Sequence, residues 1–359
     1  MKIKLICVAG ARPNFMKIAP LLRELRRHER FDCLLVHTGQ HHDENMSGRF
    51  FRDLALPEPD HFLGVGSGTH AEQTAQILMR FEPVVQEEKP HAVIVVGDVN
   101  STMACALTAA KLQIPVVHVE AGLRSFDRAM PEEINRVITD VISDLLLVTE
   151  QSGKENLLAE GVPESKIHTV GNLMVDSLLW NLSRARESDI LTRLSLSKPF
   201  ALATLHRPSN VDDMAQLAEL MSTLAVISRE LPICFPVHPR TKARTELTQL
   251  PRDHRIRFVE PLGYLDFLCL MSNSALVLSD SGGIQEETTA LGIPCLTLRN
   301  NTERPATVEL GTNTLAGTRR DTILPAYEEF KRAPKIGKVP HLWDGKAAVR
   351  CVEVFEEHF

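Results

Sequence analysis

The sequence lacks the cysteine pattern that metal sites and disulfide frameworks require. Its seven cysteines are dispersed, their number is odd, and no two of them form a C-x-x-C pair. Most stand inside apolar segments, which is typical of small core side chains in a reduced protein. We therefore expect neither a metal site nor structural disulfides.

Basic runs and long apolar runs are also missing. The formal net charge is −6 and there is no basic tail, which argues against nucleic acid or an anionic membrane surface as the main partner. No apolar stretch is long enough to span a bilayer, and the apolar run within the N-terminal MKIKLICVAGARP is too short for a secretory signal. We expect a cytoplasmic protein with no membrane partner.

The composition that is present is globular, with 43% hydrophobic and 24% charged residues among 359. Apolar strand patterns alternate with amphipathic helix patterns in two sets, separated by a helix-rich connector at about residues 172–198. This alternation predicts an α/β protein with two doubly wound, Rossmann-like parallel sheets. If the polar strand ends of the two halves face one another, they form an interdomain cleft that suits a ligand.

Two acidic residues directly follow buried strands in the first set. Asp98 comes after the strand expected at 92–96, and Glu120 after the strand expected at 115–119. Such positions project into the space above a parallel sheet, where a carboxylate gains nothing structurally, so we favour a functional role for both. Glu132 and Glu133 instead follow Pro131 at a helix start, where acidic side chains stabilise the N-terminal end of a helix.

Cations and histidines near strand ends leave two interpretations open. The turn after the first strand is not G-x-G-x-x-G, so a dinucleotide fingerprint is absent there, yet Arg12 and Lys17 flank the helix start that follows. They are either exposed cations or phosphate ligands. His206 and His238 each end a strand in the second set and are either structural or functional. The adjacent His41 and His42 do not have metal-ligand spacing.

A glycine turn in the second set has the features of an anion site. Residues 279–283, SDSGG, separate an apolar strand from a helix that runs to Leu291. Small residues at a helix N-terminus expose backbone N–H groups to a bound anion, and Arg304 follows with a guanidinium able to contact a phosphate. An ordinary serine-capped connection is the alternative.

Several longer segments carry a resemblance that covers essentially the whole chain. They are GARPNFMKIAPL (10–21), TGQH (38–41), GDVNST (97–102), HVEAGLRS (118–125), PEEINR (131–136), LHRPSN (205–210), SDSGGIQEE (279–287) and TERP (302–305). With these motifs in this order, the chain resembles the non-hydrolysing UDP-N-acetylglucosamine 2-epimerase family.

The resemblance implies the glycosyltransferase-B architecture, in which two Rossmann-like domains face one another across a cleft. It implies an N-terminal domain of residues 1–171 completed by a returning C-terminal helix at 345–359, and a UDP-binding domain of residues 172–344. It also implies a homodimer, a UDP-sugar substrate, no cofactor, and a place in nucleotide-sugar metabolism that supplies cell-surface polysaccharide biosynthesis.

The family's reaction is inversion at C2 of UDP-GlcNAc to give UDP-ManNAc, through elimination of UDP to 2-acetamidoglucal and re-addition. By motif match, Asp98, Glu120 and Glu132 are the acid/base carboxylates, and His206 is the histidine that stabilises the departing diphosphate. The other matched residues contact the nucleotide: Arg12, Lys17 and Arg304 at the diphosphate, Ser281, Gly282 and Gly283 in the phosphate turn, Glu287 at the ribose, and Leu262 and Phe267 at the uracil.

Two segments depart from the family pattern. Many bacterial members have H-R-R-E where this chain has His206-Arg207-Pro208-Ser209, and many carry a Q-H-x-x-M-L type segment where this chain has QHHDENM at 40–46. The second departure weakens the case for a second, activating UDP-GlcNAc. It also leaves room for a relative that acts on a modified sugar such as a UDP-2,3-diacetamido-uronic acid.

Three further classes remain as alternatives. A glycosyltransferase of the same architecture would use the glycine turn identically but needs no acid/base set at C2. A non-catalytic nucleotide-sugar sensor would not need Asp98, Glu120, Glu132 and His206. A hydrolysing relative, which releases free ManNAc, is usually fused to a kinase domain that we do not expect in this chain.

Overall fold

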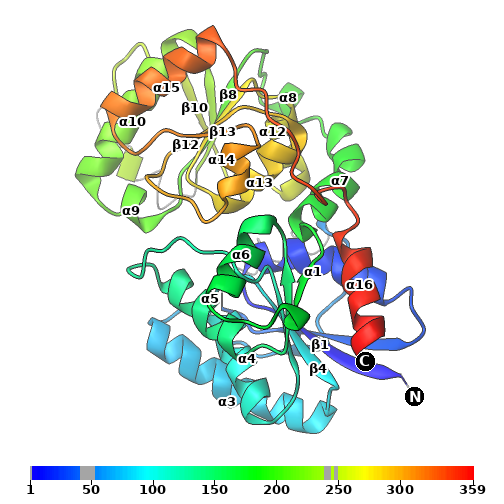
Figure 1. Ribbon diagram of the computed structural model, residues 1–359. Helices are drawn as coiled ribbons and strands as arrows, with labels where there is room; N and C mark the ends of the chain where they lie inside the picture. The colour runs from blue at the N-terminus through cyan, green and yellow to red at the C-terminus, as the bar shows by residue number, and fades with distance from the viewer. Residues whose placement is uncertain (1, 41–52, 238–243, 246–249) are drawn as a thin grey trace. The chain divides into compact units, whose positions relative to one another are not determined.

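The computed structural model describes residues 2–40, 53–237, 244–245 and 250–359, with Arg12 described for its backbone alone. The chain divides into two compact units. Unit 1 comprises Met1–Trp180 and His341–Phe359, and unit 2 comprises Asn181–Pro340. Figure 1 shows a sheet with helices around it in each of them.

Unit 1 is built on a parallel sheet with the strand order β3-β2-β1-β4-β5-β6-β7. Its strands are β1 (Ile3–Ala9), β2 (Phe31–His37), β3 (His61–Phe62), β4 (Ala92–Val96), β5 (Val116–Val119), β6 (Leu145–Val148) and β7 (Ile167–Thr169). The strand order reverses between β1 and β4, and the carboxyl ends of the strands at such a reversal are where doubly wound folds bind ligands. Every residue of β4, β5 and β6 is buried, which explains their continuous apolar sequence.

Helices cover both faces of this sheet. They are α1 (Arg12–Leu25), α3 (His70–Glu88), α4 (Asn100–Lys111), α5 (Pro131–Ile142), α6 (Gln151–Ala159), α7 (Leu173–Arg186), which crosses the unit boundary, and α16 (Ala347–His358). Ile77 and Phe81 of α3 and Ala106 of α4 pack with Val93 and Val95 of β4 in one core. On the chain's return to unit 1, α16 packs against α1, and the Asp176 carboxylate accepts the N–H groups of Ala347 and Ala348.

Unit 2 repeats the same plan with the strand order β10-β9-β8-β11-β12-β13, again all parallel. Its strands are β8 (Ala201–Thr204), β9 (Ile233–Pro236), β10 (Ile256–Val259), β11 (Leu276–Ser279), β12 (Cys295–Thr297) and β13 (Asn313–Leu315). Its helices are α8 (Ile190–Arg193), α9 (Pro208–Val211), α10 (Met214–Glu230), α12 (Tyr264–Asn273), α13 (Gly282–Leu291), α14 (Pro305–Glu309) and α15 (Arg320–Arg332). Helices α10 and α15 lie side by side (Figure 1), and Leu224 and Tyr327 join their core to Phe235 and Leu278 of the sheet.

The predicted α/β class with two doubly wound parallel sheets is confirmed. The short helix α9 ends at Val211, and α10 begins separately at Met214, because Asp213 caps it by accepting the N–H groups of Ala215 and Gln216. The sequence analysis also missed β3, α14 and β13, each of five residues or fewer. Within the described residues, we find no helix long and apolar enough to cross a membrane.

Candidate functional site

The carboxyl ends of β4 and β5 bring two of the expected residues, Asp98 and Glu120, into one region of unit 1. Gly97 and Glu120 both have left-handed backbones, with φ of +70° and +71°. A Cβ built on Gly97 would stand 3.5 Å from Glu120 Oε2 and from Lys17 Nζ. A left-handed backbone is costly at a non-glycine residue. It is supported at Glu120, because its N–H and that of Ala121 both donate to the Leu147 carbonyl, at 2.9 and 3.1 Å.

Glu120 forms a buried ion pair with Lys17 of α1. The two side chains are only 5% and 8% exposed, so the alternative of an exposed cation is wrong for Lys17. Its predicted contact with a phosphate remains a prediction. The described structure gives Lys17 a different immediate role, which is to balance the charge of a carboxylate in a nearly dry environment.

Asp98 is paired with a cation from α5. Its Oδ2 accepts hydrogen bonds from Arg136 Nη2 at 2.6 Å and Nε at 3.1 Å. Our expectation that strand-end carboxylates gain no structural contact is therefore wrong for Asp98 and Glu120 alike. The Asp98 side chain is still 28% exposed, so it remains accessible to a ligand.

The first turns of α5 carry two neighbouring acids with different environments. Glu133 is buried, and its carboxylate accepts from Arg136 at 2.6 Å, from the N–H and hydroxyl of Ser125 at 2.9 Å, and from the N–H of Phe126 at 2.9 Å. Burial acts to raise the pKa of Glu133, but these hydrogen bonds and Arg136 lower it overall. Glu132 is exposed, one helical turn before Arg136. Glu133 thus orients Arg136, and Glu132 is the accessible acid.

In unit 2, the carboxylate of Asp280 fixes His206. Asp280 is fully buried and lies 2.8 Å from His206 Nδ1. It also accepts the backbone N–H groups of His206 and Arg207 and the side-chain amide of Asn210. Burial acts to raise the pKa of Asp280, but the contacts with His206 and these donors lower it below its ordinary value. The His206 side chain is 61% exposed, so an oriented ring remains open to a ligand.

The glycine turn leads directly into α13, which begins at Gly282 with Ser281 as its N-cap residue. A Cβ built on Gly282 would stand 2.7 Å from Arg304 Nη1 and 2.8 Å from Glu303 Oε1. Only glycine permits this close approach of a guanidinium to the first turn of the helix. The N-terminal N–H groups of α13 and the adjacent Arg304 together place several hydrogen-bond donors where an anion could bind.

Two carboxylates hold Arg304 in place. Glu303 accepts from Arg304 Nη1 at 2.6 Å, and Glu286 lies 3.0 Å from Arg304 Nε. The other oxygen of Glu303 accepts from Arg299 at 2.7 Å. All four side chains are buried. Sequence analysis singled out Arg304 but missed Glu303 and Glu286, although Glu303 stands within the TERP motif.

The residues expected at the uridine lie on α12, on α13 and in the loop before α12. Tyr264, the first residue of α12, donates its hydroxyl to Glu287 Oε1 at 2.8 Å. Phe267 on α12 and Leu262 in the preceding loop are partly buried. The side chain of Arg12 and all of His41, His42 and His238 lie outside the described residues.

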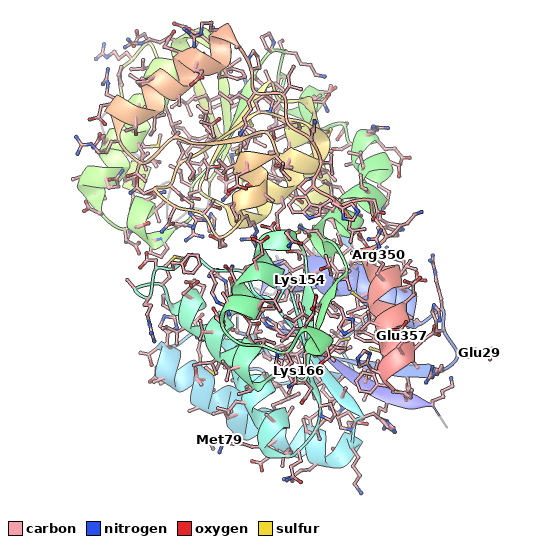
Figure 2. The ribbon with its side chains drawn as sticks, viewed as in Figure 1. Glu29, Met79, Lys154, Lys166, Arg350 and Glu357 are labelled. Atoms are coloured by element: carbon pink, nitrogen blue, oxygen red, sulfur yellow. The ribbon has the colours of Figure 1, made fainter. Side chains whose placement is uncertain are left out.

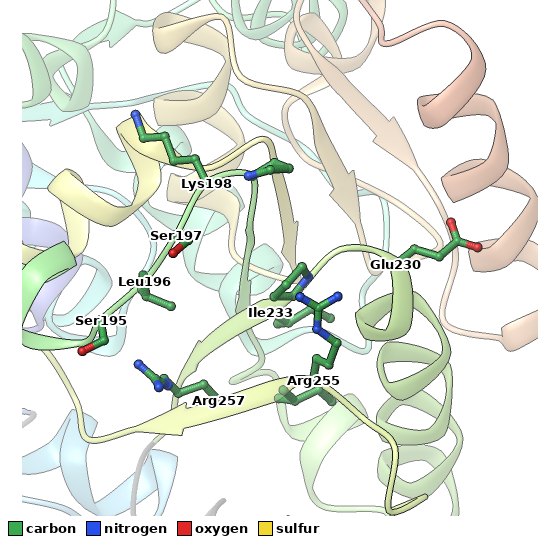
Figure 3. Close-up of a pocket in the computed structure, with 11 residues that line it drawn as sticks. Ser195, Leu196, Ser197, Lys198, Glu230, Ile233, Arg255 and Arg257 are labelled. Atoms are coloured by element: carbon green, nitrogen blue, oxygen red, sulfur yellow. The ribbon is translucent and has the colours of Figure 1, made fainter.

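A hollow of about 530 Å³ lies elsewhere in unit 2. It is at the amino ends of β8, β9 and β10, the edge opposite to the strand ends that carry His206 and Asp280. Figure 3 shows Ser195, Lys198, Ile233, Arg255 and Arg257 around it. None of the predicted site residues lines it, so we do not assign the expected chemistry to this hollow.

Comparison with known proteins identifies the chain's relatives. The family model described as UDP-N-acetylglucosamine 2-epimerase matches residues 23–356. A UDP-N-acetylglucosamine 2-epimerase of Methanocaldococcus jannaschii is 43% identical over 98% of both chains. A UDP-2,3-diacetamido-2,3-dideoxy-D-glucuronate 2-epimerase of Pseudomonas aeruginosa is 42% identical over 90% of both.

A solved structure agrees with these matches. The crystal structure of the Methanocaldococcus jannaschii UDP-GlcNAc 2-epimerase in complex with UDP-GlcNAc and UDP has a TM-score of 0.92 at 43% identity, covering 99% of this chain and 100% of that one. The family model spans nearly all of this chain, and the relatives match it over almost their full length. The chain therefore belongs to the UDP-N-acetylglucosamine 2-epimerase family.

Proposed function

We propose that this protein interconverts UDP-N-acetylglucosamine and UDP-N-acetylmannosamine by inverting C2 of the sugar. The observation that carries the proposal is the pair of carboxylates at adjacent strand ends, Asp98 with Arg136 and Glu120 with Lys17. Cationic partners keep acids ionised in a poorly solvated environment, which a base must be before it can take a proton. The 43% identical epimerase of Methanocaldococcus jannaschii supports the same assignment.

The chemistry explains why two carboxylates and a diphosphate site are needed. The proton on C2 is not next to a carbonyl, so direct removal would leave a poorly stabilised carbanion. Elimination avoids this: a base takes the C2 proton, the electrons form the C1–C2 double bond, and UDP leaves C1 with the glycosidic electron pair. Reprotonation of C2 on the other face and re-addition of UDP at C1 then give the epimer.

We assign the proton steps to unit 1. Asp98, Glu120 and Glu132 are the candidate acid/base groups. The ion pairs support this role, since Lys17 and Arg136 hold two of the carboxylates in defined orientations. Positioned groups of this kind contribute about 10²–10⁴-fold to a proton transfer.

We assign the main contacts with the leaving diphosphate to unit 2. The first turn of α13 with Ser281, Gly282 and Gly283 offers N–H donors to a phosphate, and Arg304 stands beside it. His206 is oriented at Nδ1 by Asp280, and when the ring carries both protons its Nε2–H can donate to the departing oxygen.

The remaining contacts are proposed on the same basis. We assign Glu287 to the ribose, Leu262 and Phe267 to the uracil, and Arg12 and Lys17 to the diphosphate. The elimination and re-addition steps transfer a proton and UDP but no hydride, so this route needs no nicotinamide cofactor. We also propose that no metal takes part.

A second substrate deserves the same test. The Pseudomonas aeruginosa relative, 42% identical, is named for UDP-2,3-diacetamido-2,3-dideoxy-D-glucuronate. The reaction at C2 is identical for that sugar, because the additional groups are at C3 and C6. We therefore propose the diacetamido uronate as the alternative substrate of the same site.

We further propose a homodimer that works in the cytoplasm and supplies a sugar donor for cell-surface polysaccharide. Exposed apolar side chains on unit 1 support a subunit contact: Val141 on α5 is 71% exposed, and Met79 on α3, labelled in Figure 2, is 73% exposed. All seven cysteines are free and buried, which supports a reducing compartment.

A panel of UDP-sugars followed by ¹H and ³¹P NMR tests the function. We expect the C2 epimer to accumulate to equilibrium with UDP-GlcNAc, with UDP-2,3-diacetamido-glucuronate, or with both, and without added NAD or metal. Release of free ManNAc would instead identify a hydrolysing enzyme. UDP formation only in the presence of an acceptor would identify a glycosyltransferase, and no turnover of any UDP-sugar would overturn the proposal.

A further inference from the structure

His118, the third residue of β5, is fully buried and bridges the loop after β4 to helix α5. Its Nε2 lies 2.9 Å from the carbonyl oxygen of Gly97, directly before Asp98. Its Nδ1 lies 2.6 Å from Oδ1 of Asp140 on α5. One ring therefore connects the loop that carries Asp98, the strand that leads to Glu120, and the helix packed beside them.

Both partners of the ring are acceptors. A peptide carbonyl cannot donate, and Asp140 is ionised because its Oδ2 lies 2.7 Å from Arg124 and accepts the N–H of Gly122 at 3.1 Å. Burial acts to raise the pKa of Asp140, but the charges and hydrogen bonds of His118 and Arg124 lower it overall. Both nitrogens of His118 must then donate, so the ring holds two protons and a positive charge.

This charge lies next to the candidate acid/base region. The peptide of Gly97 accepts the hydrogen bond of His118, and a Cβ on the same residue would stand 3.5 Å from Glu120 Oε2. A neutral side chain could satisfy the Gly97 carbonyl equally well. Burying a charged ring costs desolvation free energy, so we expect the charge to balance an ionic partner or to serve the reaction.

Charged groups surround the ring from several elements, whereas β6 offers only apolar residues. They are Asp140 and Arg136 on α5, Glu120 and Arg124 after β5, Asp98 after β4, Lys17 on α1, and Glu160, which pairs with Arg124. Removing the charge of His118 alone leaves Asp140 less well balanced, and the surroundings of Asp98 and Glu120 become more negative.

We propose that His118 is a positioning residue for the acid/base carboxylates. Its imidazolium fixes the spacing of the loops that carry Asp98 and Glu120 and favours the ionised form of both. The inference rests on the proposed epimerase function. The proposal predicts that replacing His118 changes kcat and the pH dependence of turnover but leaves nucleotide binding by unit 2 unchanged.

The variant His118→Gln tests the proposal, because glutamine can still donate to Gly97 but carries no charge. We expect kcat to fall between about ten-fold and a hundred-fold, with little change in KM for the UDP-sugar. With the positive charge gone, the carboxylates protonate at higher pH, so the acid limb of the pH–kcat/KM profile should move up by about one unit. An unmoved acid limb overturns the proposal, even if kcat falls.

The matched control is His61→Gln. His61 lies on β3 and contacts Glu88 at 2.8 Å, so the variant removes another imidazole–carboxylate pair from the same unit. It should leave kcat and the acid limb as in the wild type. An equal shift in both variants would assign the effect to general loss of stability and overturn the proposal.

Ring ¹⁵N NMR of the wild-type protein tests the charge without any assay or substitution. We expect one histidine ring to carry both N–H protons under the conditions of the activity assay, and its signals to be missing in His118→Gln if that variant folds. Absence of any such ring overturns the inference. An inactive wild type with a doubly protonated ring would instead contradict only the proposed function.

Discussion

Lys17 and Glu120 form a buried ion pair although they are 103 positions apart in the sequence. Lys17 comes from the first helix of unit 1, and Glu120 follows the strand beside β4. The pair therefore requires the correct assembly of β1, β4 and β5, and it sets the orientation of a carboxylate whose backbone is already constrained at φ +71°. The fold of unit 1 therefore itself orients the candidate base, Glu120.

Loss of Lys17 should affect both stability and turnover. In Lys17→Met the Glu120 carboxylate is left buried without its cation, which costs about 3–5 kcal/mol when a buried pair loses one partner. The control Lys154→Met removes the partner of the exposed Glu164 and should cost less than about 1 kcal/mol. Denaturant unfolding and kcat measure the two effects, and equal stability of both variants would contradict the account of the Lys17–Glu120 pair.

Asp280 should make unit 2 sensitive to acid. Its pKa is lowered in the folded protein, so its ionised form stabilises the fold above the ordinary aspartate pKa of about 3.9, and this stabilisation is lost as pH falls through the lowered value. We expect Asp280→Asn to unfold at a lower temperature than the wild type near neutral pH, with a difference that shrinks below about pH 4. A melting-temperature difference independent of pH would contradict this assignment.

Much of the fold follows from local pattern. The strand at 92–96 has the predicted bounds and a helix begins at Pro131 as predicted, because continuous apolar β-formers and a proline at a helix start are strong signals. The start of α13 was predicted two residues late, because the poor helix propensity of Gly282 and Gly283 argues for a turn. Tertiary context overrides that preference.

The site was less predictable, because its contacts join distant segments. The positions of Asp98, Glu120 and His206 at strand ends could be read from the sequence, but their partners could not. Asp280 and His206 are 74 positions apart, and no periodicity connects them. Asp280 did have one local signal, a polar residue at the end of a buried strand, and that signal was read only as part of a glycine turn.

Gly122 should tolerate no side chain. Its φ is +79°, and a Cβ there would overlap the carbonyl oxygen of Gly153. Gly161 has a similar φ of +83° with open space around it, so Gly161→Ala pays only the backbone cost of about 1 kcal/mol. Gly122→Ala must also displace the loop that carries Glu120, and we expect it to be destabilised by several kcal/mol or not to fold. Equal unfolding free energies for the two variants would contradict the close approach.

Glu303 should matter for nucleotide binding without contacting the nucleotide. Glu303→Gln weakens the hold on Arg304 and Arg299, so we expect the Kd for UDP, measured by calorimetry, to rise about ten-fold. Glu309→Gln, at the exposed end of α14, the short helix that follows Arg304, is the control and should bind UDP as the wild type does. Unchanged affinity in Glu303→Gln would show that Arg304 needs no such support.

The most direct test of the central claim is proton exchange at C2 of UDP-GlcNAc in heavy water, followed by NMR for the wild type, Asp98→Asn and Glu120→Gln. Should the diacetamido uronate be the true substrate, the same measurement applies to it. We expect the wild type to incorporate deuterium at C2, and each variant to do so at least about a hundred-fold more slowly while still binding UDP. Absence of exchange and epimer in the wild type, or undiminished exchange in both variants, would contradict the account.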